Sequence, residues 1–350
     1  MRAHSPCHSS LRPLGPLSLV LILAFSACST AAAGYPSHAK CGKPLCPPIG
    51  REVDSRLGLG VQDVGLLVEP DDGVSEVVKA INASQHTIMV STYLLSQHRI
   101  VRALERAAAQ GVAVFVLLDH HPFGIAQQPD TMMSLLRAAG VHVEWSPSYF
   151  VYSHAKFMVL DDSVLILSSA NFTQSGFSTD RDFVLLDDDP LDVREADNIF
   201  RADWDRIAPV LNDADLLVSP VNARNKFSQL VARARRSIDL YSEEVLDTGV
   251  VHVLIAAAHR GVHVRVLAAT VASWARQSLT RAGIQVGRRP TTTGGLYIHA
   301  KSMIVDDRLA FVGSENFSAT SLDQNRELGV IVRQPAAVVR LESTFQHDWG

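Results

Sequence analysis

Cysteine is scarce in this chain and missing from most of it. The four cysteines among the 350 residues all precede residue 50, at Cys7, Cys28, Cys41 and Cys46. The rest of the chain, which includes the expected catalytic body, therefore contains no thiol. This suits an exported enzyme. For Cys41 and Cys46 two alternatives stay open, free thiols or a small-loop disulfide formed in an oxidising compartment.

The chain also has little charge and no basic excess. Asp, Glu, Lys and Arg make up 19% of the residues, hydrophobic residues make up 47%, and the formal net charge is −4. This composition is typical of a globular chain with a sizeable core and excludes a disordered one. Nucleic acid binding normally leaves a basic footprint, so the acidic total favours other ligands, although a local basic groove stays open.

Long apolar runs are lacking as well. The run from Leu17 to Phe25 is too short to span a bilayer. It follows Arg2 and Arg12 and precedes small residues, which is the layout of an export signal. We therefore expect residues 1–33 to be removed, which shifts the net charge from −4 to −6 because two arginines and no acidic residue are lost.

The site of that cleavage has two alternatives. Ordinary cleavage would follow Ala33, whereas Cys28 resembles the cleavage box of a bacterial lipoprotein. We expect the protein to be exported, and secreted, periplasmic and lipid-anchored locations at the cell envelope all stay open.

What the chain does contain is a long internal repeat. Residues 66–70 (LLVEP) match residues 216–220 (LLVSP) at an offset of 150, and later matches lie 145 residues apart. We interpret the fall of the offset from 150 to 145 as a deletion of five residues in a loop. The chain then divides into an export signal (1–33), a Gly/Pro-rich linker (34–59), a first copy (60–210) and a second copy (211–350).

The elements of each copy alternate between helix and strand. In the first copy, apolar residues at helical spacing from Ile100 to Ala108 end at Gly111, a residue suited to a helix C-cap. A nearly continuous apolar run, 112–118, then predicts a strand buried on both faces. We expect an α/β fold of two pseudo-symmetric α/β/α repeats with mostly parallel sheets, joined in one body.

Each copy carries one H-x-K-x-x-x-x-D motif. The six residues are His154, Lys156 and Asp161 in the first copy and His299, Lys301 and Asp306 in the second. If each motif begins a strand, its histidine and lysine share a face. The imidazole can act as a nucleophile or proton carrier, and the ammonium can hold an oxyanion. One copy supplies half a site, so we expect a single active site at the interface between the copies.

Further polar residues follow both motifs at matching intervals. They are Ser169, Asn171 and Asp182 in the first copy and Ser314, Asn316 and Glu327 in the second. Both acids lie 28 residues after the histidine of their copy (182 − 154 and 327 − 299). In-line attack on a phosphodiester needs a nucleophile, an acid at the leaving oxygen, donors to the other oxygens and acids that orient the imidazoles. The set therefore points to phosphodiester chemistry.

The doubled motif with its Ser/Asn cluster and later acid resembles the phospholipase D superfamily over residues 60–350. The resemblance implies the phospholipase D fold and a metal-free phosphohistidine intermediate. It implies that His154 attacks, that His299 protonates the leaving alcohol and later activates water, and that the lysines and asparagines bind phosphoryl oxygens. Asp182 and Glu327 would hold the imidazoles. Asp161 and Asp306 belong to the motif as catalytic or supporting residues.

No metal or other cofactor is expected, because a protonated lysine has no free electron pair and repels a cation. Ser168 stands where the superfamily has glycine, which should be tolerated unless the backbone needs a positive φ. Glu243 and Glu244 are expected at the strand end of the second copy that is equivalent to the end of 112–118, where they either shape substrate choice or are merely solvated.

Three functions remain open. The first is a phospholipase D-type phosphodiesterase that acts as a monomer on phospholipid at a membrane surface, by hydrolysis or transfer. The second is an exported endonuclease of the same superfamily, with nucleic acid as the substrate. The third is a catalytically silent lipid- or phosphate-binding protein.

Overall fold

The computed structural model describes residues 49–53, 55–124, 128–287 and 295–350. The expected export signal, all four cysteines and most of the expected linker lie outside the described residues. The described residues belong to one compact unit. Both copies therefore belong to a single folded body.

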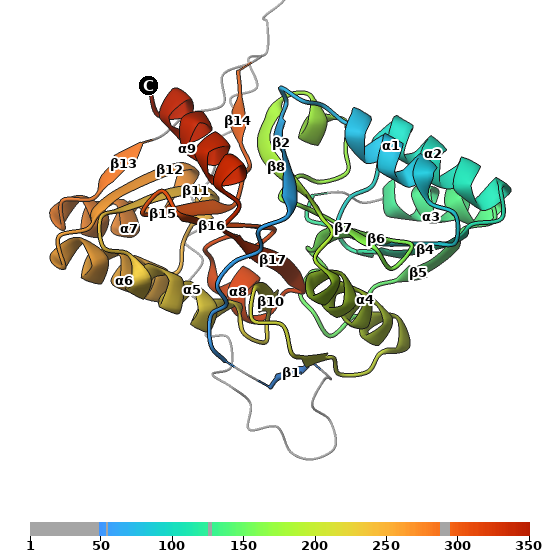
Figure 1. Cartoon of the computed structure of the whole chain (residues 1–350), viewed down its shortest axis with the longest axis horizontal. Helices are drawn as coiled ribbons and strands as arrows, with labels where there is room; N and C mark the ends of the chain where they lie inside the picture. The colour runs from blue at the N-terminus through green and yellow to red at the C-terminus, as the bar shows by residue number, and fades with distance from the viewer. Residues whose placement is uncertain (1–48, 54, 125–127, 288–294) are drawn as a thin grey trace, which may run out of the picture. The chain divides into compact units, whose positions relative to one another are not determined.

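The first copy begins with β2 and ends with α4 (Figure 1). Its main elements are β2 (Val64–Glu69), α1 (Ser75–Ala83), β3 (Thr87–Thr92), α2 (His98–Ala109), β4 (Ala113–Leu118), α3 (Gln128–Ala138), β5 (His142–Trp145), β6 (Lys156–Leu160), β7 (Val164–Ser168), β8 (Asp180–Asp187) and α4 (Pro190–Asp205). As expected from the sequence, α2 ends just before Gly111, whose φ is 91°.

The second copy repeats this order with one extra strand, β14, and with helix α8 where the first copy has only the short 3-10 helix η1 (Ser175–Phe177). Its elements are β10 (Leu216–Ser219), α5 (Ala223–Arg233), β11 (Ser237–Val245), α6 (Thr248–His259), β12 (His263–Val271), α7 (Ser273–Arg281), β13 (Gln285–Gly287), β14 (Tyr297–Ile298), β15 (Ser302–Val305), β16 (Leu309–Gly313), α8 (Ala319–Asp323), β17 (Glu327–Val332) and α9 (Pro335–Trp349). The short strands β1 (Arg51–Glu52) and β9 (Val210–Leu211) pair with each other, so part of the expected linker packs against the body.

The fold is α/β with two pseudo-symmetric repeats, as predicted, and its two large sheets have equivalent strand orders. The first sheet follows β8-β7-β6-β3-β4-β5 with β2 also paired to β8, and the second follows β10-β17-β16-β15-β11-β12-β13. Helices α1 to α3 lie beside the first sheet, and helices α5 to α7 lie beside the second (Figure 1).

The expected strand direction is corrected by the structure. Only β3–β4–β5 and β11–β12–β13 pair in parallel within their copies, while the other pairings inside each copy are antiparallel. The sheets are thus mixed. Parallel strands need a long crossover, which α2 and α3 provide, whereas β6 and β7 are joined by a turn too short for one.

Each histidine segment is attached to the sheet of the other copy. The strand β14, which directly precedes His299, pairs in parallel with β8 of the first copy at Asp180 and Arg181. In the same way Ser153, which precedes His154, forms a bridge with Arg326 of the second copy. This exchange carries both histidines to the junction between the sheets.

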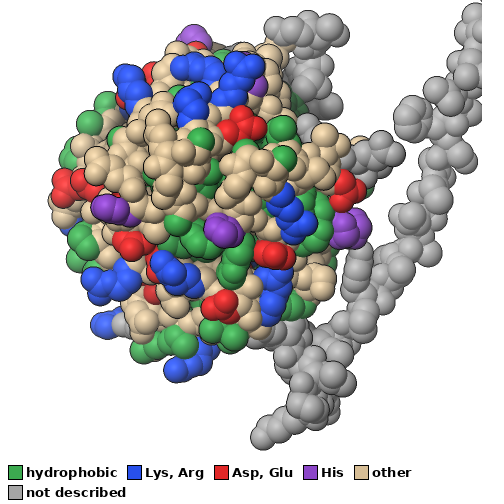
Figure 2. Space-filling view, turned by 90° about the vertical axis from the view of Figure 1, so that its right-hand side faces the viewer, with side chains coloured by type: hydrophobic (Ala, Val, Ile, Leu, Met, Phe, Trp, Pro, Cys, Tyr) green, Lys and Arg blue, Asp and Glu red, His purple; other side chains and the backbone are tan. Residues whose placement is uncertain are grey.

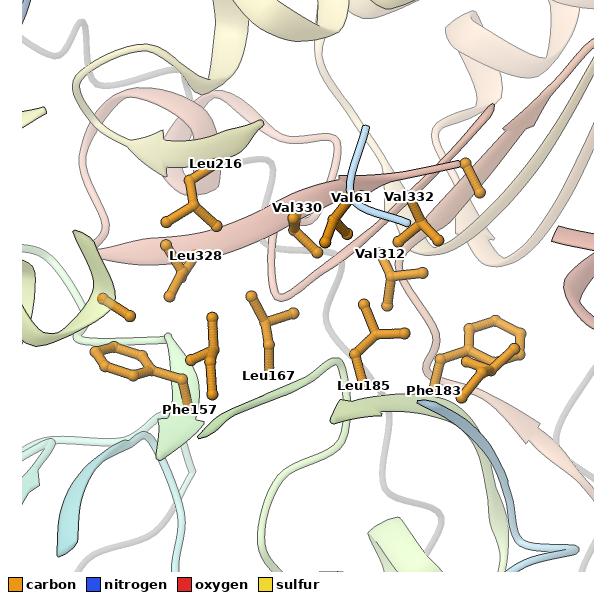
Figure 3. Packing of buried hydrophobic residues seen from close by; sticks show 14 of the residues in the cluster. Val61, Phe157, Leu167, Phe183, Leu185, Leu216, Val312, Leu328, Val330 and Val332 are labelled. Atoms are coloured by element: carbon orange, nitrogen blue, oxygen red, sulfur yellow. The ribbon is translucent and has the colours of Figure 1, made fainter. Parts of the chain in front are cut away.

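A shared apolar core fills the space between the two sheets (Figure 3). Phe157, Leu167 and Leu185 from the first sheet face Leu328 and Val330 from the second, and all five are buried. Residues of α4 and α9 belong to the same cluster. Because burial of each such side chain stabilises the fold by roughly 1.5–3 kcal/mol, this core holds the two copies in a fixed relation.

Within the described ranges, no helix combines the length and apolar character needed to cross a membrane.

Candidate active site

One cavity of about 510 Å³ is lined by residues of both copies. His154 and Asn171 come from the first copy, and His299 and Asn316 from the second. The structure thus brings the two predicted histidines and the two predicted asparagines together at this cavity. The volume of the cavity is typical of a site for a small molecule.

His154 is held by the second copy through both its backbone and its ring. Its backbone N–H donates to the carbonyl oxygen of Arg326 over 2.8 Å. Its Nδ1 lies 2.8 Å from Oε2 of Glu327. Glu327 is in turn fixed by donors from its own copy, the side chains of Ser314 (2.7 Å), Ser321 (2.7 Å) and Asn325 (3.0 Å). All four lone-pair directions of this buried carboxylate are therefore engaged.

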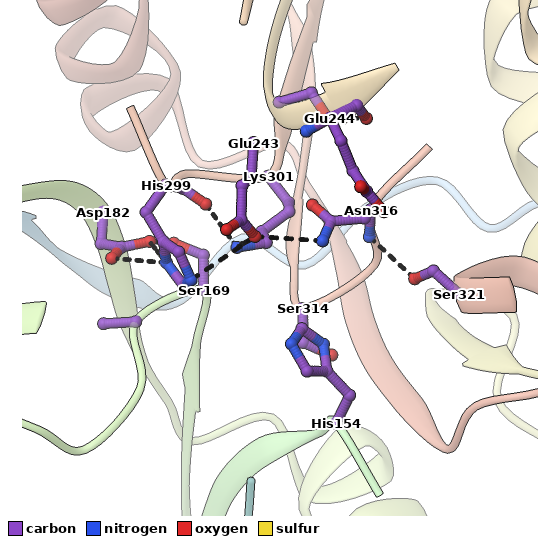
Figure 4. A network of polar contacts seen from close by, with 12 residues as sticks. His154, Ser169, Asp182, Glu243, Glu244, His299, Lys301, Ser314, Asn316 and Ser321 are labelled. Atoms are coloured by element: carbon purple, nitrogen blue, oxygen red, sulfur yellow. Dashed lines mark hydrogen bonds and ion pairs between the residues drawn. The ribbon is translucent and has the colours of Figure 1, made fainter. Parts of the chain in front are cut away.

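His299 has the mirrored arrangement (Figure 4). Its backbone N–H and that of Ala300 donate to the carbonyl oxygen of Arg181. Its Nδ1 lies 2.9 and 3.0 Å from the two carboxylate oxygens of Asp182. Ser169 donates to Asp182 over 2.6 Å. Ser169 and Ser314 thus orient the acids, and neither serine is among the described residues that line the cavity.

The histidine and the acid of each pair come from different copies. The equal spacing of Asp182 and Glu327 within their copies indicates equivalent roles but does not say which imidazole each one meets. The exchange of β14 and of Ser153 between the sheets sets the crossed pairing. Neither copy could hold its own histidine in this way.

The charge states of the first pair favour nucleophilic attack by His154. Burial lowers the pKa of His154 to about 4, so the imidazole is neutral at neutral pH. Although burial opposes it, the contacts with His154 and Lys156 lower the pKa of Glu327. Because an ionised carboxylate only accepts, the proton sits on Nδ1 and the lone pair of the neutral ring on Nε2.

Both lysines of the motifs are buried beneath the cavity. Each ammonium donates to the backbone carbonyl oxygen of the histidine two residues earlier, Lys156 to His154 and Lys301 to His299. Burial lowers the pKa of Lys156 to about 7, and the nearby charge of Lys301 acts in the same direction.

The two asparagines keep hydrogen-bonding capacity for a ligand. In the described part of the chain, Oδ1 of Asn171 and Oδ1 of Asn316 are buried without a hydrogen-bond partner. The amide nitrogen of Asn316 donates to Oε2 of Glu243 over 3.1 Å. These oxygens can only accept hydrogen bonds, so donation to an anionic ligand in the cavity would have to come from the amide nitrogens of the two asparagines.

Two residues predicted in the catalytic set lie elsewhere, and this assignment is corrected. Asp161 and Asp306 follow the far ends of β6 and β15, away from the histidines, and have φ values of 50° and 54°. Asp161 accepts hydrogen bonds from the backbone N–H groups of Gln85, His86 and Thr87.

Asp306 does the same for residues 235–237. Partial burial acts to raise the pKa of each carboxyl, but these backbone donors lower it overall. Both aspartates therefore close a tight turn and anchor the neighbouring loop, and they take no direct part at the cavity.

Ser168 is accommodated because the backbone has no need of glycine there. Neither Ser168 nor its counterpart Gly313 has a positive φ. In the second copy the glycine makes room for a buried side chain instead, since a Cβ atom on Gly313 would collide with Oε2 of Glu315. The first copy has the smaller Ala170 at that place and can carry a serine.

Sequence reasoning missed the arginines that hold the histidine segments. Arg181 pairs with Asp348 at 2.7 Å and Arg326 with Asp203 at 2.8 Å, both buried and both across the two copies. A signal was present, because Asp203 and Asp348 lie 145 residues apart and directly precede the matched tryptophans. Ser321 and Asn325 were also missed, and no repeated spacing marks them.

Glu243 reaches the cavity as well, from the end of β11. This strand is the counterpart of β3 and not of the strand at 112–118, so the expected position is corrected. Its carboxylate lies 3.1 Å from Nζ of Lys301 and 3.6 Å from Nε2 of His299. Of the two alternatives for this residue, contact with the site is therefore the one that the structure supports. Glu244 also lines the cavity.

Among the described residues, no group of three or more histidine, cysteine or acidic side chains is arranged to hold a metal ion.

The fold and the site define a pseudo-symmetric α/β protein in which two crossed histidine–carboxylate pairs meet at one cavity. Comparison with known families agrees with this description. The model of the family described as "Cardiolipin synthase, PLD-like domain" matches twice, at residues 77–204 and 227–349. The chain belongs to this family, and so to the phospholipase D superfamily.

Curated proteins with similar sequences carry related names. The human mitochondrial cardiolipin hydrolase is 27% identical over 177 residues, which is 50% of this chain and 67% of that protein. Cardiolipin synthase 1 of Bacillus anthracis is 22% identical over 336 residues, which is 81% of this chain and 66% of that protein. The chain spans about two thirds of the length of these relatives.

Two solved structures share the fold. The phosphatidylserine synthase of Haemophilus influenzae Rd KW20 aligns with a TM-score of 0.62 and 13% identity, over 83% of this chain and 87% of that one. The polyphosphate kinase of Porphyromonas gingivalis aligns with a TM-score of 0.65 and 19% identity, over 81% of this chain and 50% of that one. At such identities the likeness concerns the fold alone.

Proposed function

We propose that this protein is a phospholipase D-type phosphodiesterase that acts on phospholipids through a phosphohistidine intermediate. The observation that carries the proposal is the crossed pairing, His154 with Glu327 and His299 with Asp182, at a single cavity. Such a pair of oriented imidazoles supplies a nucleophile and a proton donor for one phosphorus atom.

In the first step, Nε2 of His154 attacks the phosphorus atom and forms a P–N bond. The bond between phosphorus and the leaving oxygen breaks, and Nε2 of His299 gives its proton to that oxygen, so a neutral alcohol departs. Glu327 holds the Nδ1 proton of His154 and stabilises the positive charge that develops on the ring.

In the second step the roles reverse. His299 takes a proton from water, the water oxygen attacks the phosphorus atom, and the P–N bond breaks to return neutral His154. An alcohol in place of water would give transfer of the phosphatidyl group rather than hydrolysis. Lys156, Lys301, Asn171 and Asn316 act as donors to the non-bridging phosphoryl oxygens in both steps.

The lining of the cavity favours lipid over nucleic acid. Among the described residues that line it there is no lysine or arginine, whereas Glu243 and Glu244 are present. Apolar side chains also reach it, Phe123 at 83% exposure and Leu246 at 39%. A basic groove, which would have favoured a nuclease, is thus not found at the site.

The outer face of the first copy is consistent with this choice. Figure 2 shows basic side chains at several places on that face with acidic and apolar side chains between them. The names of the relatives, which refer to cardiolipin, add support for a phospholipid substrate. We also propose that the protein is exported, on the basis of residues 1–33.

The test is turnover by the purified mature protein in the presence of a chelator. Vesicles of phosphatidylcholine, phosphatidylglycerol and cardiolipin are compared with single-stranded DNA, and phosphatidic acid is measured by mass spectrometry. We expect phosphatidic acid from at least one lipid and no loss of rate with the chelator. Activity on DNA alone would establish the endonuclease alternative, and binding without turnover the silent one. A rate that needs a divalent ion would refute the metal-free mechanism.

A further inference from the structure

The carboxylate of Glu243 occupies the donors that a phosphoryl group would use in the second copy. Oε2 of Glu243 accepts from Nζ of Lys301 and from Nδ2 of Asn316, each over 3.1 Å. Oε1 accepts from the hydroxyl of Tyr297, also over 3.1 Å. Figure 4 shows this carboxylate beside Lys301, Asn316 and the ring of His299.

The carboxyl group of Glu243 is ionised and not neutral. Burial opposes ionisation, but the positive charge of Lys301 and the hydrogen bond from Asn316 hold the pKa of Glu243 well below its usual range. The side chain is 27% exposed, so it borders the cavity and is not enclosed in the core. A second anion that reached Lys301 would meet this carboxylate there.

The first copy has no acidic residue at the position equivalent to Glu243. Because β3 and β11 pair with β6 and β15 in the same register, Glu243 corresponds to Tyr93, at the offset of 150. The ring of Tyr93 packs edge-on against His154, with 4.7 Å between centroids, and Nζ of Lys156 lies 5.4 Å from its centre. The two halves of the site therefore differ by one negative charge at equivalent places.

We propose that the Glu243 carboxylate is a resident anion of the phosphoryl-binding half-site of Lys301 and Asn316, which a phosphodiester must displace and which selects against more highly charged phosphates. This rests on the proposed role of those two residues and not on the identity of the lipid. A phosphodiester brings one negative charge into the half-site, whereas a phosphate monoester brings roughly 1.5 to 2 near neutral pH and inorganic phosphate also brings more than one. Repulsion by Glu243 therefore weakens binding of the dianion more.

The experiment measures anion binding without turnover. Inorganic phosphate and tungstate are titrated by calorimetry into the wild-type protein, Glu243→Gln, Glu243→Ala and the matched control Glu244→Gln. Glu244 also lines the cavity, and none of its hydrogen bonds is to Lys301 or Asn316 among the described residues. We expect both Glu243 variants to bind the anions at least about tenfold more tightly, since loss of a like charge a few ångströms away exceeds about 1.4 kcal/mol.

The control should change the affinity by less than about threefold, because Glu244 has its side-chain hydrogen bond with Ser318 and interacts with Lys301 only through its charge. Unchanged or weaker binding in both Glu243 variants would overturn the proposal and indicate that Glu243 only positions Lys301. Absence of binding in every protein would overturn it as well. Failure of lipid turnover would instead refute the proposed function. The anion affinities of the variants would still test the role of Glu243, because they are measured without turnover.

Discussion

Glu327 and His154, which lie 173 residues apart in the chain, share a buried 2.8 Å hydrogen bond between Oε2 and Nδ1. This bond sets the tautomer that leaves the Nε2 lone pair for attack. In Glu327→Gln an amide N–H can donate to Nδ1 and move the proton to Nε2. We expect kcat to fall by about 10²–10⁴-fold with a smaller change in KM.

Steady-state kinetics on phospholipid vesicles measure this effect. Asp323→Asn serves as the control, because Asp323 lies in the neighbouring helix α8 and pairs with Arg224 at the surface. Equal losses in the two variants would show that the effect of Glu327 is general and not exerted through His154.

The two histidines should behave differently in trapping experiments. In His299→Asn, attack by His154 on a substrate with an activated leaving group can proceed, but water is not activated, so a phosphoenzyme should accumulate. In His154→Asn no phosphoenzyme should form. Acid-quenched samples with labelled substrate, followed by peptide mass spectrometry, locate the phosphoryl group. Label on His299 would exchange the proposed roles.

The pH dependence should reflect the low pKa values of His154 and Lys156. His154 must be neutral, and its pKa is lowered to about 4, so kcat/KM should lose activity on the acid side only as the pH falls toward 4. Lys156 must be protonated, and its pKa is lowered to about 7, so kcat/KM should decline as the pH rises through 7.

A bound phosphodiester anion favours the protonated lysine, so the alkaline decline of kcat should lie at higher pH than that of kcat/KM. In Lys156→Arg the guanidinium stays charged, so the part of the alkaline decline of kcat/KM that comes from Lys156 should disappear and leave only the decline caused by loss of the His299 proton that the leaving oxygen needs. An unchanged decline in this variant would assign it to another group.

The buried pair of Arg326 and Asp203 should be essential for stability. Asp203→Asn leaves the guanidinium of Arg326 buried without its counterion, and we expect the free energy of unfolding to fall by about 3–5 kcal/mol. Chemical denaturation followed by circular dichroism measures this change. Asp205→Asn, at an exposed position two residues later, should stay within about 0.5 kcal/mol of the wild type.

Gly313 and Glu315 should be energetically coupled. A Cβ atom on Gly313 would also lie 2.6 Å from Cα of Gly329, so Gly313→Ser should lower the free energy of unfolding by about 1–3 kcal/mol. Glu315→Ala removes the carboxyl that fills this space and should relieve part of the loss. A double-mutant cycle should give a coupling of about 0.5–3 kcal/mol. Strict additivity would contradict this explanation of why the second copy has glycine where the first has Ser168.

The sequence predicted which residues lie at the site better than it predicted what each of them does there. The repeated spacing identified both histidines, both lysines and both asparagines, since equivalent positions in two copies fold alike. The same spacing also included Asp161 and Asp306, because a tight turn that needs an aspartate repeats as faithfully as a catalytic group does. Glu243 could not be assigned, because its counterpart Tyr93 differs and a repeat carries no information where its copies diverge.

The sequence also predicted the relative direction of only some of the strands. The helix and apolar run at 98–118 predicted a crossover and a parallel pair, and β3, β4 and β5 have that arrangement. The hairpins of β6, β7 and β8 gave no comparable signal. The turn between β6 and β7 is too short for a crossover, and β8 returns antiparallel to β7 after residues 169–179, which becomes clear only once the ends of each strand are known.

The sequence by itself determined that the chain has two equivalent halves and which residue of one corresponds to which residue of the other, because spacing along a covalent chain is a local property. Only the tertiary structure decided that each histidine takes its acid from the other half. That choice depends on β14 adding to β8 and on Ser153 meeting Arg326. A hydrogen bond forms between groups that are adjacent in space, and no spacing within one copy specifies which segment of the other lies beside it.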